Sequence, residues 1–208
     1  VEEMPTGEIS LAAGVGTSGS SIGGGLTEKN FLGKGINLTT ALEISESSIK
    51  GQFVYSKPNF AYTDNTLNTS LASTTTDNLT DFGYKVSETG FSVGTDFEQY
   101  ENLFFSPSAS ISIEDLETNS SASTNLKKQE GSYTDLYFKY GLNYDLRNSK
   151  YMTSSGNRTV FYQELPLVSD GNEILNSISF DQFQKLSKNS DVIGKASFYF
   201  KAINSIDP

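Results

Sequence analysis

Hydrophobic and polar residues alternate with a period of two along most of this chain. The clearest run covers residues 8–16, where every second position is apolar: Ile9, Leu11, Ala13 and Val15. Such alternation is typical of a β-strand with one apolar face. Residues 17–19 predict a tight turn, because glycine tolerates the positive φ that hairpins need. The chain therefore opens with a strand and a turn.

The rest of the chain carries the same signal. A return strand around residues 22–26 follows the first turn, and residues 28–35 predict the turn that closes this hairpin. Nine further runs predict strands at about residues 36–45, 48–56, 65–76, 82–97, 103–116, 136–145, 158–165, 174–186 and 192–202, and the parity of residues 174–186 is unclear. We therefore expect an all-β protein of eleven antiparallel strands in meander order.

Three stretches depart from simple alternation. The apolar positions change parity within residues 82–97, which predicts a β-bulge near residues 88–90. Pro107 lies inside a predicted strand, and in a soluble sheet a proline would push that strand to an edge. Residues 117–131 are polar and low in complexity, so we expect a long mobile loop there.

Composition and charge narrow the function. The chain has 208 residues, a net charge of −10, and neither cysteine nor histidine. The negative charge argues against nucleic-acid binding, which needs a basic face. The missing residue types exclude thiol catalysis, histidine-based triads and Cys/His zinc sites. The acidity fits a wet polar lumen, and solubility alone is an equal alternative.

The strand lengths favour a membrane barrel over a soluble sheet. No apolar run approaches eighteen residues, so the sequence predicts no transmembrane helix. A membrane-spanning strand needs about 9–11 alternating residues, and several of the predicted strands reach that length. Aromatic residues gather near predicted strand ends, as an interfacial girdle requires; these are Phe31, Phe60, Tyr62, Phe82, Tyr100, Tyr144 and Tyr151. A soluble β-sandwich or an adhesin-like solenoid is the alternative.

Two motifs carry a resemblance to a known family. The opening stretch of residues 6–35 contains a Thr-Gly entry and the sequence Asn-Phe-Leu-Gly-Lys-Gly, whose matching residues are Asn30, Phe31, Leu32, Gly33 and Gly35. It resembles the start of the barrel in the BamA family of outer-membrane protein assembly factors, within the surface-antigen and POTRA-barrel superfamily. Pro58 and Phe60 partly match a later turn of that family. A second signature is matched by Asp145, Arg147 and Gly156, with the family's proline replaced by Thr153.

The resemblance implies a partial barrel. The family barrel is sixteen-stranded, and this chain would supply about the first eleven strands of that antiparallel transmembrane β-barrel. Residues 1–5 would be the end of the last POTRA repeat or a linker, and residues 6–208 the N-terminal portion of the barrel. No Arg-Gly-Phe motif and no terminal aromatic strand occur in the sequence, so we interpret the chain as a fragment or a truncated product.

The resemblance also implies a function in the bacterial outer membrane. A member of this family inserts barrel proteins through a lateral seam at its first strand. The implied partners are outer-membrane lipid, unfolded outer-membrane protein clients and accessory lipoproteins, with no nucleic acid. The client-pairing edge would be residues 8–16, that is Glu8, Ile9, Ser10, Leu11, Ala12, Ala13, Gly14, Val15 and Gly16. Gly14 and Gly16 would weaken the seam, although simple barrel curvature explains them equally well.

Other functions stay open at this point. The same resemblance allows a TamA-like translocation factor, and a passive porin-like channel or a surface adhesin belongs to a different class. Catalytic candidates are few: Glu114, Asp115 and Glu117 form an acidic cluster that a solvated loop rim explains better than hydrolysis does. We therefore expect no enzyme, no catalytic residue, no metal site and no cofactor.

Overall fold

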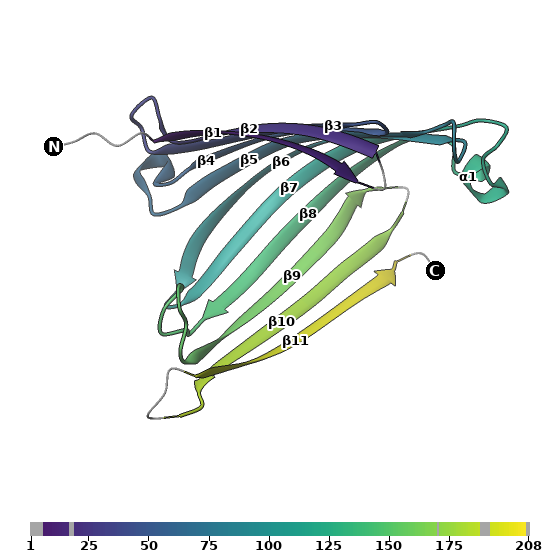
Figure 1. The fold of residues 1–208 in the computed structure, drawn as a ribbon. Helices are drawn as coiled ribbons and strands as arrows, with labels where there is room; N and C mark the ends of the chain where they lie inside the picture. The colour runs from purple at the N-terminus through teal and green to yellow at the C-terminus, as the bar shows by residue number, and fades with distance from the viewer. Residues whose placement is uncertain (1–5, 17–18, 170, 188–191, 207–208) are drawn as a thin grey trace.

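The chain forms one curved sheet of eleven strands (Figure 1). The computed structural model describes residues 6–16, 19–169, 171–187 and 192–206. The strands are β1 (Gly7–Gly16), β2 (Gly19–Phe31), β3 (Ile36–Ser45), β4 (Ser48–Lys57), β5 (Thr66–Asn78), β6 (Tyr84–Tyr100), β7 (Leu103–Thr118), β8 (Gly131–Asp145), β9 (Gly156–Val168), β10 (Glu173–Lys185) and β11 (Ile193–Ser205). A 3₁₀ turn, η1 (Phe60–Tyr62), and a short helix, α1 (Thr124–Lys128), lie between strands.

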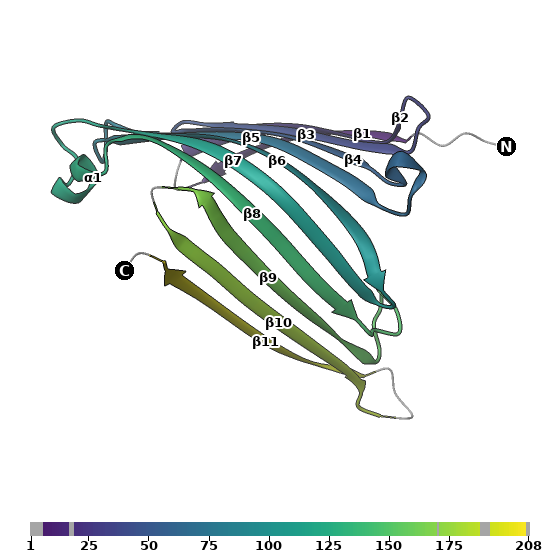
Figure 2. The same ribbon diagram turned by 180° about the vertical axis from the view of Figure 1, so that it is seen from behind.

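The strands follow one another as an antiparallel meander, which confirms the expected fold class. Each strand pairs with its neighbours in sequence, from β1 at one edge to β11 at the other. The sheet bends into an open trough, and in both views β1 and β11 lie at separate edges (Figures 1 and 2). Within the described residues neither edge strand pairs with a second neighbour on its outer side. The chain therefore presents two unpaired strand edges.

Register aligns the alternation of neighbouring strands into two continuous faces. One row of register partners, across β4 to β8, is apolar throughout: Phe53, Leu71, Phe91, Ile111 and Leu136. The next row points to the opposite side, because successive side chains of a strand alternate; it consists of Gln52, Ala72, Gly90, Ser112 and Asp135. We call these the apolar face and the polar face. The sheet is a single layer, and its described residues include only three buried hydrophobic side chains, Ile36, Leu116 and Ala122.

The two ends of the sheet carry different turns. The N-terminal end holds the start of β1 and the connections at residues 32–35, 58–65, 101–102 and 146–155. The opposite end, which we call the α1 end, holds the connections at residues 46–47, 79–83 and 119–130. Figure 1 shows the start of β1 and α1 on opposite sides of the molecule.

The bulge expected near residues 88–90 is absent. Pairing between β5 and β6 runs without a shift from Tyr84 to Asp96, and the irregularity in β6 lies between Glu98 and Tyr100. The parity change has another cause. Val86 pairs with Leu116, and Leu116 is only 6% exposed, so the polar face itself becomes apolar at the α1 end.

Pro107 does not place its strand at an edge. β7 pairs with β6 on one side and β8 on the other, and Pro107 is the register partner of Tyr140. Toward β6, pairing is recorded at Gly94 with Ser108 and at Phe97 with Phe105, with a gap between them. A proline lacks the backbone N–H that a ladder needs, so it fits at this interruption.

The polar stretch of residues 117–131 is more ordered than expected. β7 continues to Thr118, β8 begins at Gly131, and α1 lies between them. The hydroxyl of Ser123 accepts a hydrogen bond from Leu126 N and caps this helix, and Lys127 Nζ donates to Ser120 O. Among the described residues, no helix has the length and apolar character needed to cross a membrane.

Several predicted boundaries also move. β2 extends to Phe31, so the closing turn is confined to residues 32–35 rather than 28–35. β10, whose parity was ambiguous in sequence, places Ile178 and Phe180 in register with Phe161 and Thr159 of β9. Residues 1–5 and the turn residues Thr17 and Ser18 lie outside the described residues.

Candidate functional site

The first strand is the most exposed element of the sheet. All ten residues of β1 are exposed, and Ile9, Leu11 and Val15 are 74%, 84% and 87% exposed. On its inner side β1 pairs with β2 along its whole length, from Gly7 opposite Glu28 to Gly16 opposite Gly19. Within the described residues its other side has no strand partner, as is also true of the outer side of β11, and such edges can template pairing with another chain.

The hydrogen-bonding pattern between β1 and β2 shows which residues of β1 direct their backbone N–H and C=O groups away from β2, toward the unpaired edge. Lys29 N donates to Thr6 O at 3.1 Å, so these two residues form a hydrogen-bonded pair. Hydrogen-bonded and non-hydrogen-bonded pairs alternate along an antiparallel ladder. Even-numbered residues of β1 therefore direct their backbone groups toward β2. The odd-numbered residues Gly7, Ile9, Leu11, Ala13 and Val15 direct their N–H and C=O groups toward the free edge.

The sequence prediction treated residues 8–16 as one edge, and the structure divides them. Glu8, Ser10, Ala12, Gly14 and Gly16 hold β1 to β2 through their backbones. Gly7 belongs to the free-edge set and was missed. Alternating hydropathy gives no hydrogen-bond phase, so the sequence carried no signal that could separate the two sets.

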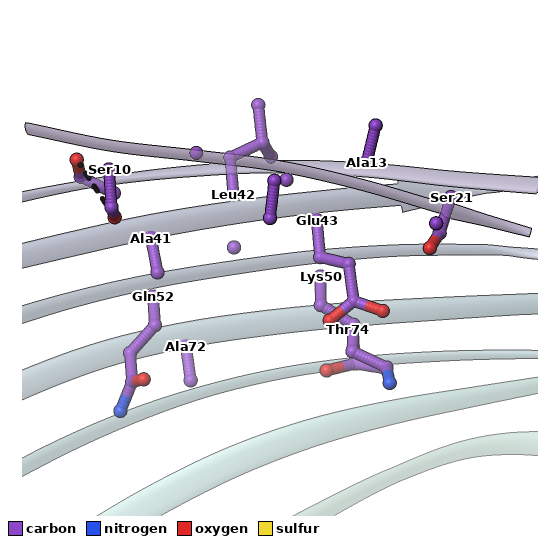
Figure 3. Close-up of a pocket in the computed structure, with 16 residues that line it drawn as sticks. Ser10, Ala13, Ser21, Ala41, Leu42, Glu43, Lys50, Gln52, Ala72 and Thr74 are labelled. Atoms are coloured by element: carbon purple, nitrogen blue, oxygen red, sulfur yellow. Dashed lines mark hydrogen bonds between the residues drawn. The ribbon is translucent and has the colours of Figure 1, made fainter.

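The partner strand β2 has three consecutive glycines, and therefore no side chains, where it pairs with the middle of β1. Gly23, Gly24 and Gly25 are opposite Ala12, Leu11 and Ser10. A hollow of about 640 Å³ opens beside this row over β1 to β5. In Figure 3 Ala41, Gln52 and Ala72 point to one side of the sheet, and Leu42 and Ala13 point to the other. Because these side chains are small, the part of the sheet next to β1 has few side-chain contacts.

The Asn30–Gly35 motif builds the turn that ends the first hairpin. Asn30 Oδ1 accepts a hydrogen bond from Gly35 N at 2.7 Å, and Asn30 O accepts one from Gly33 N at 2.9 Å. Gly33 and Gly35 have φ of 69° and 65°, and Leu32 has φ of 57°. Glycine adopts this left-handed region without a Cβ penalty. The motif thus has a structural role at the N-terminal end.

Pro58 and Phe60 shape the next turn at the same end. Pro58 follows the last residue of β4, where a missing N–H costs no ladder bond. Phe60 N donates to Asn65 O at 2.8 Å, which closes the turn. Lys57 Nζ lies 5.7 Å from the centroid of the Phe60 ring, within the range of a cation–π contact.

The second signature forms a compact turn between β8 and β9. Arg147 donates to both carboxylate oxygens of Asp145, from Nε at 2.8 Å and from an Nη at 2.7 Å. Asp145 is the last residue of β8 and adjoins the turn at the N-terminal end of the sheet. The Arg147 hydrogen bond lowers the pKa of Asp145 to about 2. Gly156 has φ of 96°, and a Cβ there would lie 2.1 Å from Leu146 O, so the turn requires glycine.

The acidic residues of β7 do not form a joint site. Glu114 and Asp115 are successive strand residues and point to opposite faces. Glu117 lies 3.9 Å from Lys85 Nζ across the β6–β7 pair. In the part of the chain that the structure describes, no three His, Cys, Asp or Glu side chains are grouped to hold a metal ion.

The comparisons with known proteins agree with this architecture. The family model of the Omp85 superfamily domain matches residues 30–206. The chain belongs to the Omp85 superfamily. A solved structure with a similar fold is the crystal structure of BamA from Haemophilus ducreyi lacking POTRA domains 1–3, with a TM-score of 0.76 and 22% sequence identity. The match covers 99% of this chain and 42% of that one. A search of curated protein sequences finds no match.

Membership of the Omp85 superfamily fixes the environment of the two faces. The chain is part of a bacterial outer-membrane β-barrel, and its eleven strands form a BamA-like sheet. In such a barrel the apolar face meets lipid and the polar face lines the interior. The apolar row across β4 to β8 is therefore the lipid side, and the free edge of β1 runs through the membrane.

Proposed function

We propose that this Omp85 chain is the seam-bearing part of an outer-membrane assembly factor, which folds client barrel proteins by pairing their strands with β1. The observation that carries this proposal is the free edge of β1, whose odd-numbered residues present unpaired backbone groups. We also propose that residues 1–5 link this sheet to a preceding POTRA repeat, and that accessory lipoproteins assist the complete protein.

The hydrocarbon of the bilayer makes pairing with this edge favourable for a client strand. A client strand that enters hydrocarbon with unsatisfied N–H and C=O groups pays several kcal/mol for each group. A protein edge that offers matching groups removes much of that cost by β-augmentation. No covalent step is needed, so the proposed activity is that of a folding catalyst and not of an enzyme with a reacting side chain.

The weak support behind β1 favours an edge that can move. Gly23, Gly24 and Gly25 place no side chain against the centre of β1. Glycine within a strand weakens it, because it has no side chain to pack and loses more backbone entropy. An edge strand held in this way can adjust its path to that of an incoming strand.

A pair of proline substitutions in the complete protein tests the proposal. Leu11→Pro removes an N–H from the free edge and leaves the β1–β2 ladder intact, whereas Ala12→Pro removes a donor that β2 uses. We expect Leu11→Pro to fold normally and to slow client insertion into vesicles by about tenfold or more, because each lost ladder bond costs on the order of 1 kcal/mol and proline also obstructs pairing.

The control separates pairing from stability. Ala12→Pro should lower the stability of the sheet, measured as the urea midpoint of unfolding in lipid, by more than Leu11→Pro does. Normal client insertion by a correctly folded Leu11→Pro variant would contradict the proposed pairing edge. A Leu11→Pro variant as unstable as Ala12→Pro would contradict the assigned hydrogen-bond phase.

A further inference from the structure

A hydrogen-bonded cluster of polar side chains lies on the apolar face, across the neighbouring strands β8, β9 and β10 (Figure 1). Tyr140, Gln163 and Asn176 are successive register partners, and Tyr140 shares the parity of Leu136. The Tyr140 hydroxyl donates to Gln163 Oε1 at 2.8 Å, and Gln163 Nε2 donates to Asn176 Oδ1 at 2.5 Å. We call these three residues the amide cluster. Because the apolar face meets lipid, the cluster brings polar groups into an apolar environment.

The amide cluster lies within the apolar band and not at its rim. β10 starts at the α1 end, as the other even-numbered strands do, and Asn176 is its fourth residue. With a rise of about 3.3 Å per residue and a strand tilt of about 40°, Asn176 is about 8 Å below that strand end along the membrane normal. Both amides have apolar neighbours on the same face before and after them in the strand; these are Phe161, Leu165, Ile174 and Ile178.

Neighbouring rings hold Tyr140 in place. The centroid of its ring lies 6.0 Å from that of Phe105 and 6.1 Å from those of Phe138 and Phe161. Centroids at such distances are typical of aromatic pairs. The three contacts fix the hydroxyl beside Gln163, so the orientation of the Gln163 amide is set by the protein itself.

The amide cluster carries more hydrogen-bond donors than it uses. Tyr140 has one polar hydrogen, and the amides of Gln163 and Asn176 have two each. The two hydrogen bonds of the cluster use two of these hydrogens, and the described residues offer no acceptor to the other three. A polar hydrogen without an acceptor is unfavourable in hydrocarbon, where no water replaces the missing partner.

Gln182 shows the opposite arrangement on the same face of β10. Its Nε2 donates to Gly156 O at 3.2 Å and to Phe183 O at 3.1 Å, so its amide hydrogens are bonded within the chain. The sheet can therefore satisfy an amide on this face through its own carbonyls. The unused donors are a particular property of the amide cluster.

A membrane lipid is the partner whose chemistry fits these donors. The remaining strands of a barrel extend its wall and do not cover its outer face. An opposing membrane protein offers few free acceptors, because its backbone carbonyls are already bonded within helices or barrels. The carbonyl that links an acyl chain to a lipid headgroup accepts hydrogen bonds and cannot donate them. Gln163 and Asn176 are half-buried, so a lipid beside the sheet can reach them.

We propose that Gln163 and Asn176 bind the acyl-linkage carbonyl of a lipid in the leaflet at the α1 end, and that Tyr140 positions the Gln163 amide for this contact. Ester-linked and amide-linked lipids both carry the required carbonyl. Such carbonyls lie at the boundary of the hydrocarbon, and the flexible amide side chains extend toward it from a short depth. This site is independent of client pairing at β1.

A competition between ester-linked and ether-linked lipids tests the site, because the two differ in the carbonyl alone. The complete protein is equilibrated in detergent with equal amounts of diester and diether phosphatidylethanolamine, one of them with deuterated chains. Native mass spectrometry then counts the lipids retained during stepwise delipidation. We expect the last retained lipid to be the diester by about fivefold or more, since one or two net hydrogen bonds distinguish the lipids. A third arm with amide-linked chains identifies which carbonyl source binds better.

Three variants separate binding from stability. The double variant Gln163→Leu and Asn176→Leu should retain both lipids equally, and its fold is compatible with leucine on a lipid-facing surface. Tyr140→Phe keeps the ring contacts and should lower the preference about twofold, because the Gln163 amide is no longer positioned. Gln182→Leu is the matched control and should keep the parent ratio.

Two results would overturn the proposal. One is equal retention of diester and diether lipid by the parent protein. The other is an unchanged preference in the double variant, with or without a lower urea midpoint of unfolding in lipid, which would show that the amide cluster only joins β8, β9 and β10.

Discussion

Two regions of the sheet, the β6–β9 strands and the β1–β2 pair, are stabilised by different interactions. Between β6 and β9 the apolar face carries a chain of ring contacts, with centroids 5.7 Å apart for Phe97 and Phe105, 6.0 Å for Phe105 and Tyr140, and 6.1 Å for Tyr140 and Phe161. In the middle of the β1–β2 pair, Ser10, Leu11 and Ala12 are opposite glycines, and the Ser10 Oγ to Gly25 O contact is long, at 3.5 Å. The first region adds side-chain contacts to its ladder, while the second depends on backbone bonds.

The polar face repeats this contrast. Lys139 Nζ lies 3.2 Å from Glu164 between β8 and β9, and Ser70 and Ser92 hydroxyls lie 2.7 Å apart between β5 and β6. Beside β1 the polar face is hollowed over the Gly23–Gly25 row. The strand that is proposed to exchange partners is therefore held by fewer side-chain contacts than the strands of the β5–β9 region.

The largest expected loss of stability is at the turn between β8 and β9, in the region that has many side-chain contacts. Gly156→Ala should lower the free energy of unfolding by about 3 kcal/mol or more, because the new Cβ would lie 2.1 Å from Leu146 O and the residue has positive φ. Gly33→Ala is the matched control, with φ of 69° and no atom within 4 Å of the added Cβ. It should cost about 1 kcal/mol, the penalty of φ alone. Urea unfolding in lipid measures both, and equal losses would show that crowding at Gly156 is unimportant.

A smaller effect is expected from acid at the same turn. The Arg147 contact lowers the pKa of Asp145 to about 2, so the folded state favours the carboxylate. The stabilisation is present above the unfolded pKa, near 4, and is lost as the pH falls toward about 2. Arg147→Gln should therefore cost about 1–2 kcal/mol at pH 6 and much less at pH 2, because the contact is then already lost.

Unfolding of the parent and of Arg147→Gln in urea at both pH values measures this difference. A cost that stays the same at pH 2 and pH 6 would mean that Arg147 contributes by packing and not through the Asp145 carboxylate.

The smallest expected effects compare hydroxyls on the two sides. Ser92→Ala removes the 2.7 Å contact with Ser70 and should cost about 0.5–1 kcal/mol. Ser10→Ala removes the 3.5 Å contact with Gly25 O and should change the free energy of unfolding by less than about 0.5 kcal/mol. If Ser10→Ala lowered the free energy of unfolding more than Ser92→Ala in the same urea titration, the side-chain contacts of the β1–β2 pair would be the stronger ones, which would contradict the comparison.

Much of the fold could be read from alternation. The run of Ile9, Leu11 and Val15 identified β1, and comparable runs identified most of the other strands, because a strand that separates lipid from a wet interior must alternate, whereas the parity of residues 174–186 was unclear. The motifs at Asn30 and Asp145 also coincided with turns, since left-handed backbone needs glycine and local hydrogen-bond acceptors. The bulge near residues 88–90 was a wrong inference, because local hydropathy could not show that the polar face turns apolar beside Leu116.

The sequence by itself determined the strand order, the alternation that gives many strands an apolar and a polar side, and the turns that need glycine, because these depend on residues that are close in the chain. Only the tertiary structure decided which residues of β1 direct their backbone groups toward the unpaired edge. The alternation of bonded and non-bonded pairs follows from pairing with β2 and not from the side-chain pattern. It also decided which turn residues adopt positive φ without being glycine or asparagine, namely Leu32, Ala61, Tyr62 and Met152. Backbone dihedrals and exposure are properties of the assembled sheet, in which residues far apart in sequence fix each other's geometry.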